Sequence, residues 1–237
     1  MQMSFRIYSL GDQAITVDWG NSIDPDRNDR VYALFQYFKR KPLPGMHDLV
    51  PAYSSLSILF DPEAVWRHAP GILPSETLRE ELEQAVRTLD LAPAGPARHI
   101  RIPVCYHPSL APDLESVAAR SGLRPEAVVA LHTSREYRVY MLGFLPGFAY
   151  LGSVDARIAA PRLAAPRVQV PTGSVGIAGE QTGIYPLESP GGWNLIGRTP
   201  VRMFDPGQSP PTLLLPGDRV RFEAISLQQF HRYATSL

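Results

Sequence analysis

Alternating apolar and polar residues open the chain, and a helical repeat follows them. The segment "FRIYSLGDQAITVDW" (5–19) alternates on both sides of "LGDQ", which is typical of two antiparallel strands joined by a turn. After Asp24 and Pro25, apolar residues recur at helical spacing, at Val31, Leu34, Phe35 and Phe38. This pattern predicts a helix with Asp24 as its N-cap, a proline in its first turn and one aromatic face.

A second pair of strands and a second helix are predicted before residue 91. The segment "HDLVPAYSSLSILFD" (47–61) indicates two short strands broken at Pro51. The segment "PSETLREELEQAVRTLD" (74–90) indicates a helix capped by Ser75, with an apolar stripe formed by Leu78, Leu82, Val86 and Leu89. The order ββαββα predicts a small α+β domain over residues 1–92, similar in outline to a split βαβ unit.

Residues 91–98, "LAPAGPAR", combine prolines, a glycine and small side chains, which predicts a boundary between two domains. The charge changes sign at the same place: residues 1–95 contain 9 basic and 13 acidic residues, and residues 96–237 contain 14 basic and 10 acidic ones. The formal net charge of the whole chain is zero. The attraction to phosphates on which nucleic-acid binders depend is therefore missing, and no nucleic-acid partner is expected.

The second domain, residues 98–237, is predicted to be mainly β. It begins with a strand, two short helical segments and another strand: "HIRIPVCY", "PDLESVAARSG", "RPEAVVALHT" and "YRVYMLGF". From residue 143 onward, short extended segments alternate with Gly/Pro turns: "RVQV", "SVGIAG", "WNLIG", "VRMF" and "DRVRFEAI". This spacing is typical of a β-barrel or a β-sandwich.

Several catalytic and binding signatures are missing from the sequence. It contains no P-loop G-x-x-x-x-G-K-[ST], no H-E-x-x-H and no paired cysteines, so no metal site is expected in this chain. The single cysteine, Cys105, excludes an internal disulfide, and its strand-like apolar setting predicts a buried, inert thiol. Because the start is not leader-like and no apolar run approaches roughly 18 residues, we expect a cytoplasmic protein with no membrane contact.

The segment from Gly143 to Arg202 has the composition of an anion-binding site. It holds ten glycines and five arginines but only three acidic residues. Glycine backbone N–H groups and an arginine fork can bind one anion together. The predicted binding residues are Arg167, Gln181, Thr182, Tyr185, Ser189, Gly191, Gly192 and Arg198. In the alternative interpretation the glycines only form barrel turns, and Trp193 and Phe148 fill a core.

Four further residues are candidates for a cleft: His132, Phe144, Phe148 and Trp193. His132 ends the apolar helical segment "AVVALHT", so it is interpreted first as a helix-terminal cation that faces the helix dipole, with a role in a cleft as the alternative. No nucleophile or general base stands at a recognisable spacing. Catalytic residues therefore stay unassigned.

Long ordered motifs give the chain a resemblance to a known family. They are "GDQAITVDWG", "YRVYMLGFLPGFAYLG", "PRLAAPR", "VPTGSVGIAGEQTGIYP", "SPGGWNLIGRTP" and "PGDRVRF". The chain resembles, over nearly its whole length, the allophanate hydrolase subunit 1/KipI family, whose members are now generally called the B subunit of 5-oxoprolinase. One departure is visible: Tyr106 is followed by His107 and Pro108, where the family tends to have a Gly-rich "YGG" turn.

The resemblance implies an N-terminal α+β domain and a C-terminal cyclophilin-like β-barrel. It also implies a component of an ATP-dependent hydrolase that opens 5-oxoproline (pyroglutamate) to glutamate. The implied partners are an allophanate hydrolase subunit 2-type protein (the C subunit of 5-oxoprolinase) and a third protein (the A subunit), and ATP is implied as a substrate of the complex. In such a complex, the Gly-rich face with Trp193 and Phe148 is expected to lie at or near the partner contact.

Three alternative functions remain open because a fold does not determine a reaction. The same family includes a sporulation histidine-kinase inhibitor, which makes a kinase regulator the first alternative. The domain pair also resembles the carboxyltransferase part of urea carboxylase, so a carboxyltransferase-like half of a urea- or allophanate-metabolising enzyme is the second. Peptidyl-prolyl isomerase activity, which follows only from the cyclophilin-like shape, is the third.

Overall fold

A computed structural model describes residues 4–88 and 97–234 of the 237-residue chain. Contacts within the chain divide it into two compact units, Met1–Pro96 and Ala97–Leu237. Most of the predicted boundary segment, 91–98, lies outside the described residues, so the position of the boundary stays a prediction. None of the helices in the described ranges is long and apolar enough to cross a membrane.

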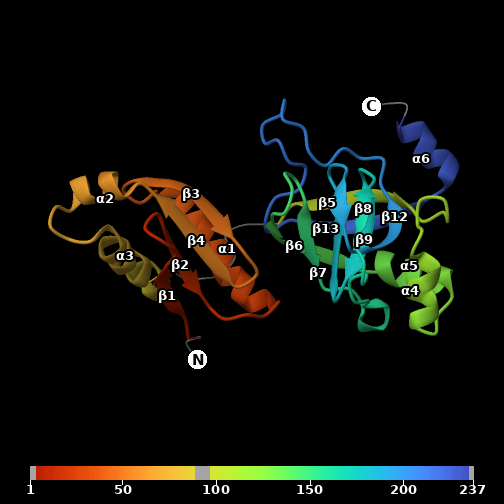
Figure 1. The fold of residues 1–237 in the computed structure, drawn as a ribbon, viewed down its shortest axis with the longest axis horizontal. Helices are drawn as coiled ribbons and strands as arrows, with labels where there is room; N and C mark the ends of the chain where they lie inside the picture. Colours follow the sequence, from red (N-terminus) through yellow and green to blue (C-terminus); the bar gives the residue numbers. More distant parts are fainter. Residues whose placement is uncertain (1–3, 89–96, 235–237) are drawn as a thin grey trace. The chain divides into compact units, whose positions relative to one another are not determined.

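The first unit is an antiparallel sheet in the order β1-β2-β4-β3 with helices packed on it (Figure 1). Its strands are β1 (Arg6–Ser9), β2 (Ala14–Asp18), β3 (Met46–Pro51) and β4 (Ser55–Phe60). Its helices are α1 (Pro25–Arg40), α2 (Pro62–His68) and α3 (Pro74–Thr88). The predicted strands and the two predicted helices are confirmed over the described residues, and α2 is an addition to the predicted order. Leu89, the last predicted member of the second apolar stripe, lies outside the described residues.

Local capping explains where these helices begin. The Asp24 carboxylate accepts hydrogen bonds from the backbone N–H groups of Asp26 (2.8 Å) and Arg27 (3.0 Å), which confirms the predicted N-cap. The prediction for Ser75 is wrong: α3 begins at Pro74, so Ser75 already lies within the first turn. Proline is favoured at that position because its missing N–H has no partner in the first turn.

One face of the sheet carries the core of the first unit. Alternate strand residues point to this face: Ile7, Ile15, Val17, Leu56, Ile58 and Phe60. They meet the apolar stripes of α1 and α3, formed by Val31, Leu34, Phe38, Leu78, Leu82 and Val86. Burial of these side chains provides the main stabilisation of the unit.

The second unit is a closed barrel of seven strands in the order β10-β7-β6-β13-β5-β12-β9 (Figure 1). The strands are β5 (His99–Cys105), β6 (Glu136–Leu142), β7 (Ala149–Gly152), β9 (Ser174–Ala178), β10 (Gln181–Ile184), β12 (Asn194–Arg198) and β13 (Arg219–Ile225). The first and last of them, β5 and β13, pair in parallel, whereas the other neighbours are antiparallel. The predicted combination of an α+β domain and a mainly β barrel domain is confirmed.

Further elements pack around the barrel. They are α4 (Leu114–Arg120), α5 (Pro125–Thr133), the 3₁₀ turn η1 (Ala156–Ile158), α6 (Leu227–Ala234), and the two-stranded sheet of β8 (Arg167–Val170) and β11 (Ser189–Gly191). The helices α4 and α5 contact each other and lie at one end of the barrel (Figure 1). The predicted strand "VRMF" is wrong, because only Phe204 forms a bridge, to Thr212. Pro200 and Pro206 flank it and limit strand pairing.

The alternation of side chains along the barrel strands produces two separate apolar layers. Val175 and Ile177 of β9 point into the barrel interior, and the intervening Gly176 faces outward. On the outer face lies a second layer, called here the aromatic cluster: Phe148, Val170, Ala178, Tyr185, Trp193 and Leu195.

Cys105 is buried, as predicted.

Candidate functional site

A pocket of about 250 Å³ opens over the aromatic cluster. It is lined by Phe144, Phe148, Tyr150, Arg162, Pro166, Tyr185, Pro190, Gly191, Gly192 and Trp193. We call it the aromatic pocket. It brings together six of the predicted residues: Phe144, Phe148, Tyr185, Gly191, Gly192 and Trp193.

Phe148 is the centre of the aromatic walls. Its ring makes edge contacts with Tyr150, Tyr185 and Trp193 at centroid distances of 4.9, 5.2 and 5.4 Å. Edge-to-face packing suits the charge distribution of aromatic rings and holds them in defined orientations. The walls are therefore preformed and apolar.

The glycines beneath the pocket give these rings their space. An added Cβ at Gly183 would lie 3.0 Å from Cζ of Phe148 and 3.1 Å from Cζ3 of Trp193. At Gly176 an added Cβ would lie 3.0 Å from Cβ of Trp193. Both glycines thus let large rings lie directly on the barrel strands, and this close packing accounts for much of the Gly-rich composition.

Phe144 forms an exposed lip beside the pocket. Its side chain is 62% exposed, and its φ of 68° is in the left-handed region that non-glycine residues rarely adopt. The turn is closed by a hydrogen bond of 2.8 Å from the Leu145 N–H to the Gly143 carbonyl. The Phe144 ring contacts Phe148 and Tyr185 edge-on, at 5.7 and 6.5 Å. An unusual backbone conformation next to a pocket is typical of functional sites.

Arg162 is the single cation among the described residues that line the pocket. Sequence reasoning did not select it. Burial raises the pKa of Tyr150 and of Tyr185, and the nearby Arg162 guanidinium acts on both in the opposite direction. Both phenols therefore stay protonated at neutral pH and put no negative charge in the pocket.

Arg167 and Arg198, predicted to hold the anion, do not line the pocket. Arg167 Nη2 donates a 2.6 Å hydrogen bond to Asp113, and Asp113 also accepts one from the Leu195 N–H at 2.6 Å. Arg198 Nε donates to the Thr172 carbonyl at 2.7 Å. In the structure, each of these arginines connects two segments of the second unit through its hydrogen bond.

The remaining predicted residues also lie elsewhere. Gln181 begins β10 and pairs with Gly152 and Ala178 on the neighbouring strands. Thr182, the next residue, points into the barrel and is fully buried. The Ser189 hydroxyl donates to the Pro190 carbonyl at 3.1 Å. None of these three side chains lines the aromatic pocket.

His132 lies in the barrel interior and not in a cleft. It is fully buried, and this burial lowers its pKa to about 3, so the interpretation as a helix-terminal cation is wrong. Its Nε2 lies 2.9 Å from the Thr182 hydroxyl and its Nδ1 lies 2.8 Å from the Tyr106 hydroxyl. The ring stacks on Phe222 at 4.5 Å.

The hydrogen bonds of this group fix the tautomer of His132. The Thr182 hydroxyl donates its proton to the Gly176 carbonyl at 3.0 Å, so it can only accept from His132 Nε2–H. In a neutral ring Nδ1 is then the acceptor, and the Tyr106 hydroxyl donates to it. The hydrogen bonds are thus donated in one direction, from Tyr106 to His132 and from His132 to Thr182. We call these three residues the histidine relay.

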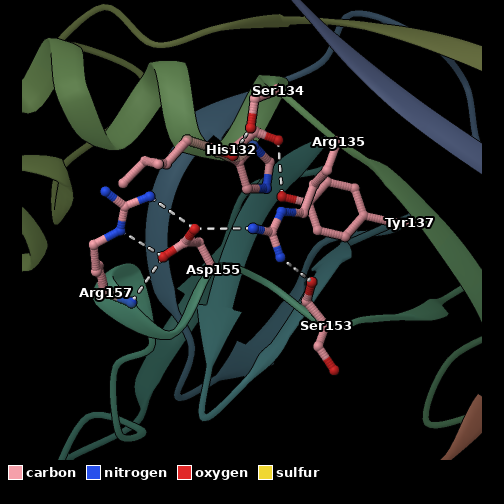
Figure 2. Close-up of polar contacts among 8 residues, drawn as sticks. His132, Ser134, Arg135, Tyr137, Ser153, Asp155 and Arg157 are labelled. Carbon is pink, nitrogen blue, oxygen red and sulfur yellow. Dashed lines mark hydrogen bonds and ion pairs between the residues drawn. The ribbon is translucent and has the colours of Figure 1, made fainter.

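A charged network formed by Arg135, Asp155 and Arg157 lies near His132 (Figure 2). Asp155 accepts from Arg135 at 2.9 Å and from Arg157 Nε at 2.8 Å, and the hydrogen bonds from Arg157 hold the pKa of the Asp155 carboxyl well below its usual range. The Tyr137 hydroxyl donates to the His132 carbonyl at 2.8 Å. Because both guanidinium groups are bound to the Asp155 carboxylate, the network positions the 153–157 turn.

The described residues contain no group of three His, Cys, Asp or Glu side chains that could hold a metal ion. The expected contact of Trp193 with a partner stays a prediction; within this chain its side chain is only 4% exposed and packs within the aromatic cluster. Phe144 is the aromatic side chain of this site that is open to a partner.

The match of residues 5–214 to the family model "Carboxyltransferase domain, subdomain C and D" shows that the chain belongs to this family. It is 44% identical over 235 residues to the B subunit of 5-oxoprolinase from Bacillus subtilis (strain 168), covering 98% of each chain. It is 40% identical over 218 residues to the B subunit of 5-oxoprolinase from Escherichia coli O157:H7, covering 92% of this chain and 94% of that one. These matches confirm the resemblance to the B subunits of 5-oxoprolinases.

A solved structure extends the comparison. The chain superposes on the crystal structure of TTHA0988 with a TM-score of 0.77 and 41% sequence identity. The match covers 90% of this chain and 40% of that chain. In TTHA0988 the matching fold is thus part of a longer polypeptide.

Proposed function

We propose that this chain is one subunit of an ATP-dependent 5-oxoprolinase, which opens 5-oxoproline to glutamate. The observation that carries the proposal is the 44% identity to the B subunit of a 5-oxoprolinase over 98% of both chains. The pocket supports a binding role: its described lining contains aromatic, proline and glycine residues and one arginine, and no Ser, Cys, His, Asp, Glu or Lys. The chain binds and orients a substrate, and other subunits supply the missing reactive groups.

The proposed chemistry requires activation of a stable amide. Transfer of the γ-phosphoryl group from ATP to the amide oxygen releases ADP and activates the ring carbon toward water. Addition of water to this carbon and cleavage of its C–N bond open the ring to the acyl phosphate of glutamate, and a second water hydrolyses this acyl phosphate to glutamate and phosphate. The aromatic pocket, at about 250 Å³, is smaller than the roughly 300–1,000 Å³ of sites for drug-sized ligands. It suits a small acid better than a nucleotide, so we place ATP on another subunit.

The proposed partners are an allophanate hydrolase subunit 2-type protein (the C subunit of 5-oxoprolinase) and a third protein, the A subunit, in a cytoplasmic complex. The longer chain of TTHA0988, of which this fold covers 40%, supports a partner that adjoins this fold. Two exposed apolar side chains support a contact beside the pocket: Phe144 on its lip, and Val168, which is 88% exposed, on β8. Aromatic side chains are enriched at the cores of such interfaces.

Reconstitution tests this function directly. The chain is purified with its two candidate partner proteins from the same organism, and glutamate formation from 5-oxoproline is measured with and without ATP. We expect activity that requires ATP and all three proteins. Full activity without this chain would reject the proposal. Autophosphorylation of the host histidine kinases, measured with and without the chain, tests the regulator alternative separately.

A further inference from the structure

We propose that the aromatic pocket binds a small, ring-shaped carboxylic acid, with its carboxylate paired to Arg162 and its ring packed on the aromatic walls. That the acid is 5-oxoproline rests on the proposed function. The chemical class of the ligand rests on the pocket alone.

Arg162 is available to a ligand, unlike the other arginines between Gly143 and Arg202. Four of the five arginines between Gly143 and Arg202 already have partners: Arg157 with Asp155, Arg167 with Asp113, Arg198 with the Thr172 carbonyl and Arg202 with Asp205. Arg162 makes no hydrogen bond or ion pair with any residue that the structure describes. Its guanidinium is thus free to pair with a ligand, and its planar fork matches a carboxylate with two parallel hydrogen bonds.

The surroundings of Arg162 strengthen such a pair. No acidic residue belongs to the described lining, so nothing there competes for the guanidinium. Because burial raises the pKa values of Tyr150 and Tyr185, these phenols stay neutral and do not repel an anion. Arg162 is exposed, so a ligand carboxylate can reach its guanidinium from solvent.

The size and shape of the pocket restrict the rest of the ligand. A volume of about 250 Å³ excludes long chains, and the preformed edge-to-face rings offer flat apolar surfaces. A compact ring fits such surfaces with little loss of conformational freedom on binding. The pocket should therefore distinguish ligands mainly by the presence of the carboxylate.

Three probes and two variants test this assignment. The probes are 5-oxoproline, cyclopentanecarboxylate (a ring acid without a lactam) and 2-pyrrolidinone (the lactam without a carboxylate). Binding to the full chain is measured by calorimetry and by the NMR signal of the Trp193 indole N–H, which reports from the pocket wall. Arg162→Gln removes the charge, and Arg202→Gln is the matched control because Arg202 is exposed and paired with Asp205.

We expect both acids to bind the wild-type chain at least tenfold more tightly than 2-pyrrolidinone. Arg162→Gln should weaken both acids at least tenfold and leave 2-pyrrolidinone unchanged, while Arg202→Gln should change none of the three. Equal affinity of Arg162→Gln and wild-type for the acids overturns the assignment. Failure of either acid to bind the wild-type chain overturns it as well.

The reconstituted complex separates this inference from the proposed function. In an active complex, Arg162→Gln should raise the KM for 5-oxoproline at least tenfold, and an unchanged KM counts against Arg162. If the complex shows no 5-oxoprolinase activity while both acids still bind through Arg162, the proposed function fails and the carboxylate site stands.

Discussion

At the residue scale, two adjacent glycines of the aromatic pocket differ in the space around them. An added Cβ at Gly191 would lie 2.8 Å from Cε1 of Tyr185, whereas at Gly192 the nearest atom would be Cγ of Pro166, at 3.6 Å. The Tyr185 ring is buried against Phe148 and cannot turn aside without disturbing the aromatic cluster. Gly191 is therefore required for packing, and Gly192 tolerates a side chain.

Alanine substitution tests this difference. Gly191→Ala is expected to lower the free energy of unfolding by roughly 1–3 kcal/mol, because the added methyl group overpacks Tyr185. Gly192→Ala, the matched control, should stay within about 0.5 kcal/mol of the wild type. Urea unfolding monitored by circular dichroism provides both values. Equal losses in the two variants would contradict the role of the Tyr185 contact.

Arg167 shows how a predicted anion-binding residue can have a structural role. Its partner Asp113 is largely buried and receives hydrogen bonds from Arg167 and from the Leu195 N–H. Arg167→Gln removes the compensating charge and is expected to cost roughly 1–3 kcal/mol of stability. Arg101→Gln breaks an exposed pair with Glu223, whose side chains are 77% and 45% exposed, and should cost at most about 1 kcal/mol. Similar urea midpoints for the two variants would show that the Arg167 pair is not structural.

At the scale of elements, the histidine relay connects parts of the barrel that are distant in sequence. His132 lies on α5, Thr182 lies on β10, and Tyr106 directly follows β5. Each buried polar atom of the relay has a partner, which is the condition under which a buried polar network stabilises a core. The relay therefore orients α5 against the barrel.

The pKa of His132 predicts an acid-sensitive stability. Its value is about 3 in the folded chain and about 6.5 in the unfolded chain, so the unfolded state binds more protons between these values. The contribution of neutral His132 to the free energy of unfolding is complete above pH 6.5 and is lost as the pH falls toward 3. Between these values this one group lowers the free energy of unfolding by about 1.4 kcal/mol per pH unit.

Variants separate this slope from the effect of other groups. His132→Gln should unfold more easily at pH 7 but should show a shallower dependence on pH between about 6 and 4 than the wild type. His99→Gln, which changes an exposed histidine, is the control for the substitution itself. An unchanged slope in His132→Gln would mean that His132 does not titrate as its burial predicts.

The sequence predicted most elements, and the missed ones have physical reasons. Long repeats such as that of α1 stand out because many side chains share one buried face. The helix α2 has seven residues and one buried side chain, Val65, which is too few to establish a period. Strand β10, "QTGI", resembles a turn because its glycine gives space to Phe148 and Trp193 and does not terminate the strand.

At the scale of the whole molecule, the sequence predicted the segment that lines the candidate pocket and six of the lining residues, but it did not single out Arg162. The Gly-rich segment could be predicted because glycines and aromatic residues stand together in the chain. The sequence could not show which arginine is free, because the partner of Arg167 is Asp113, 54 positions away. Nor could the sequence show that Thr182 points into the barrel while the adjacent Gly183 underlies the pocket, because that depends on the closure and register of the barrel.

The last prediction concerns assembly with a partner. Two aromatic residues of one pocket should affect different properties: Trp193 the stability of the chain, and Phe144 its association with the partner. Trp193→Ala removes a side chain that is 4% exposed and should cost roughly 3–5 kcal/mol of stability. Phe144→Ala keeps the Cβ and the unusual backbone but removes an exposed ring, so its melting temperature should stay near that of the wild type. If Phe144 anchors the partner protein, its loss should weaken association by about 2 kcal/mol, or roughly thirtyfold. Thermal melting of each variant, compared with its affinity for the purified partner, measures both effects. A Trp193→Ala variant that melts like the wild type but binds the partner poorly would make Trp193 the anchor instead.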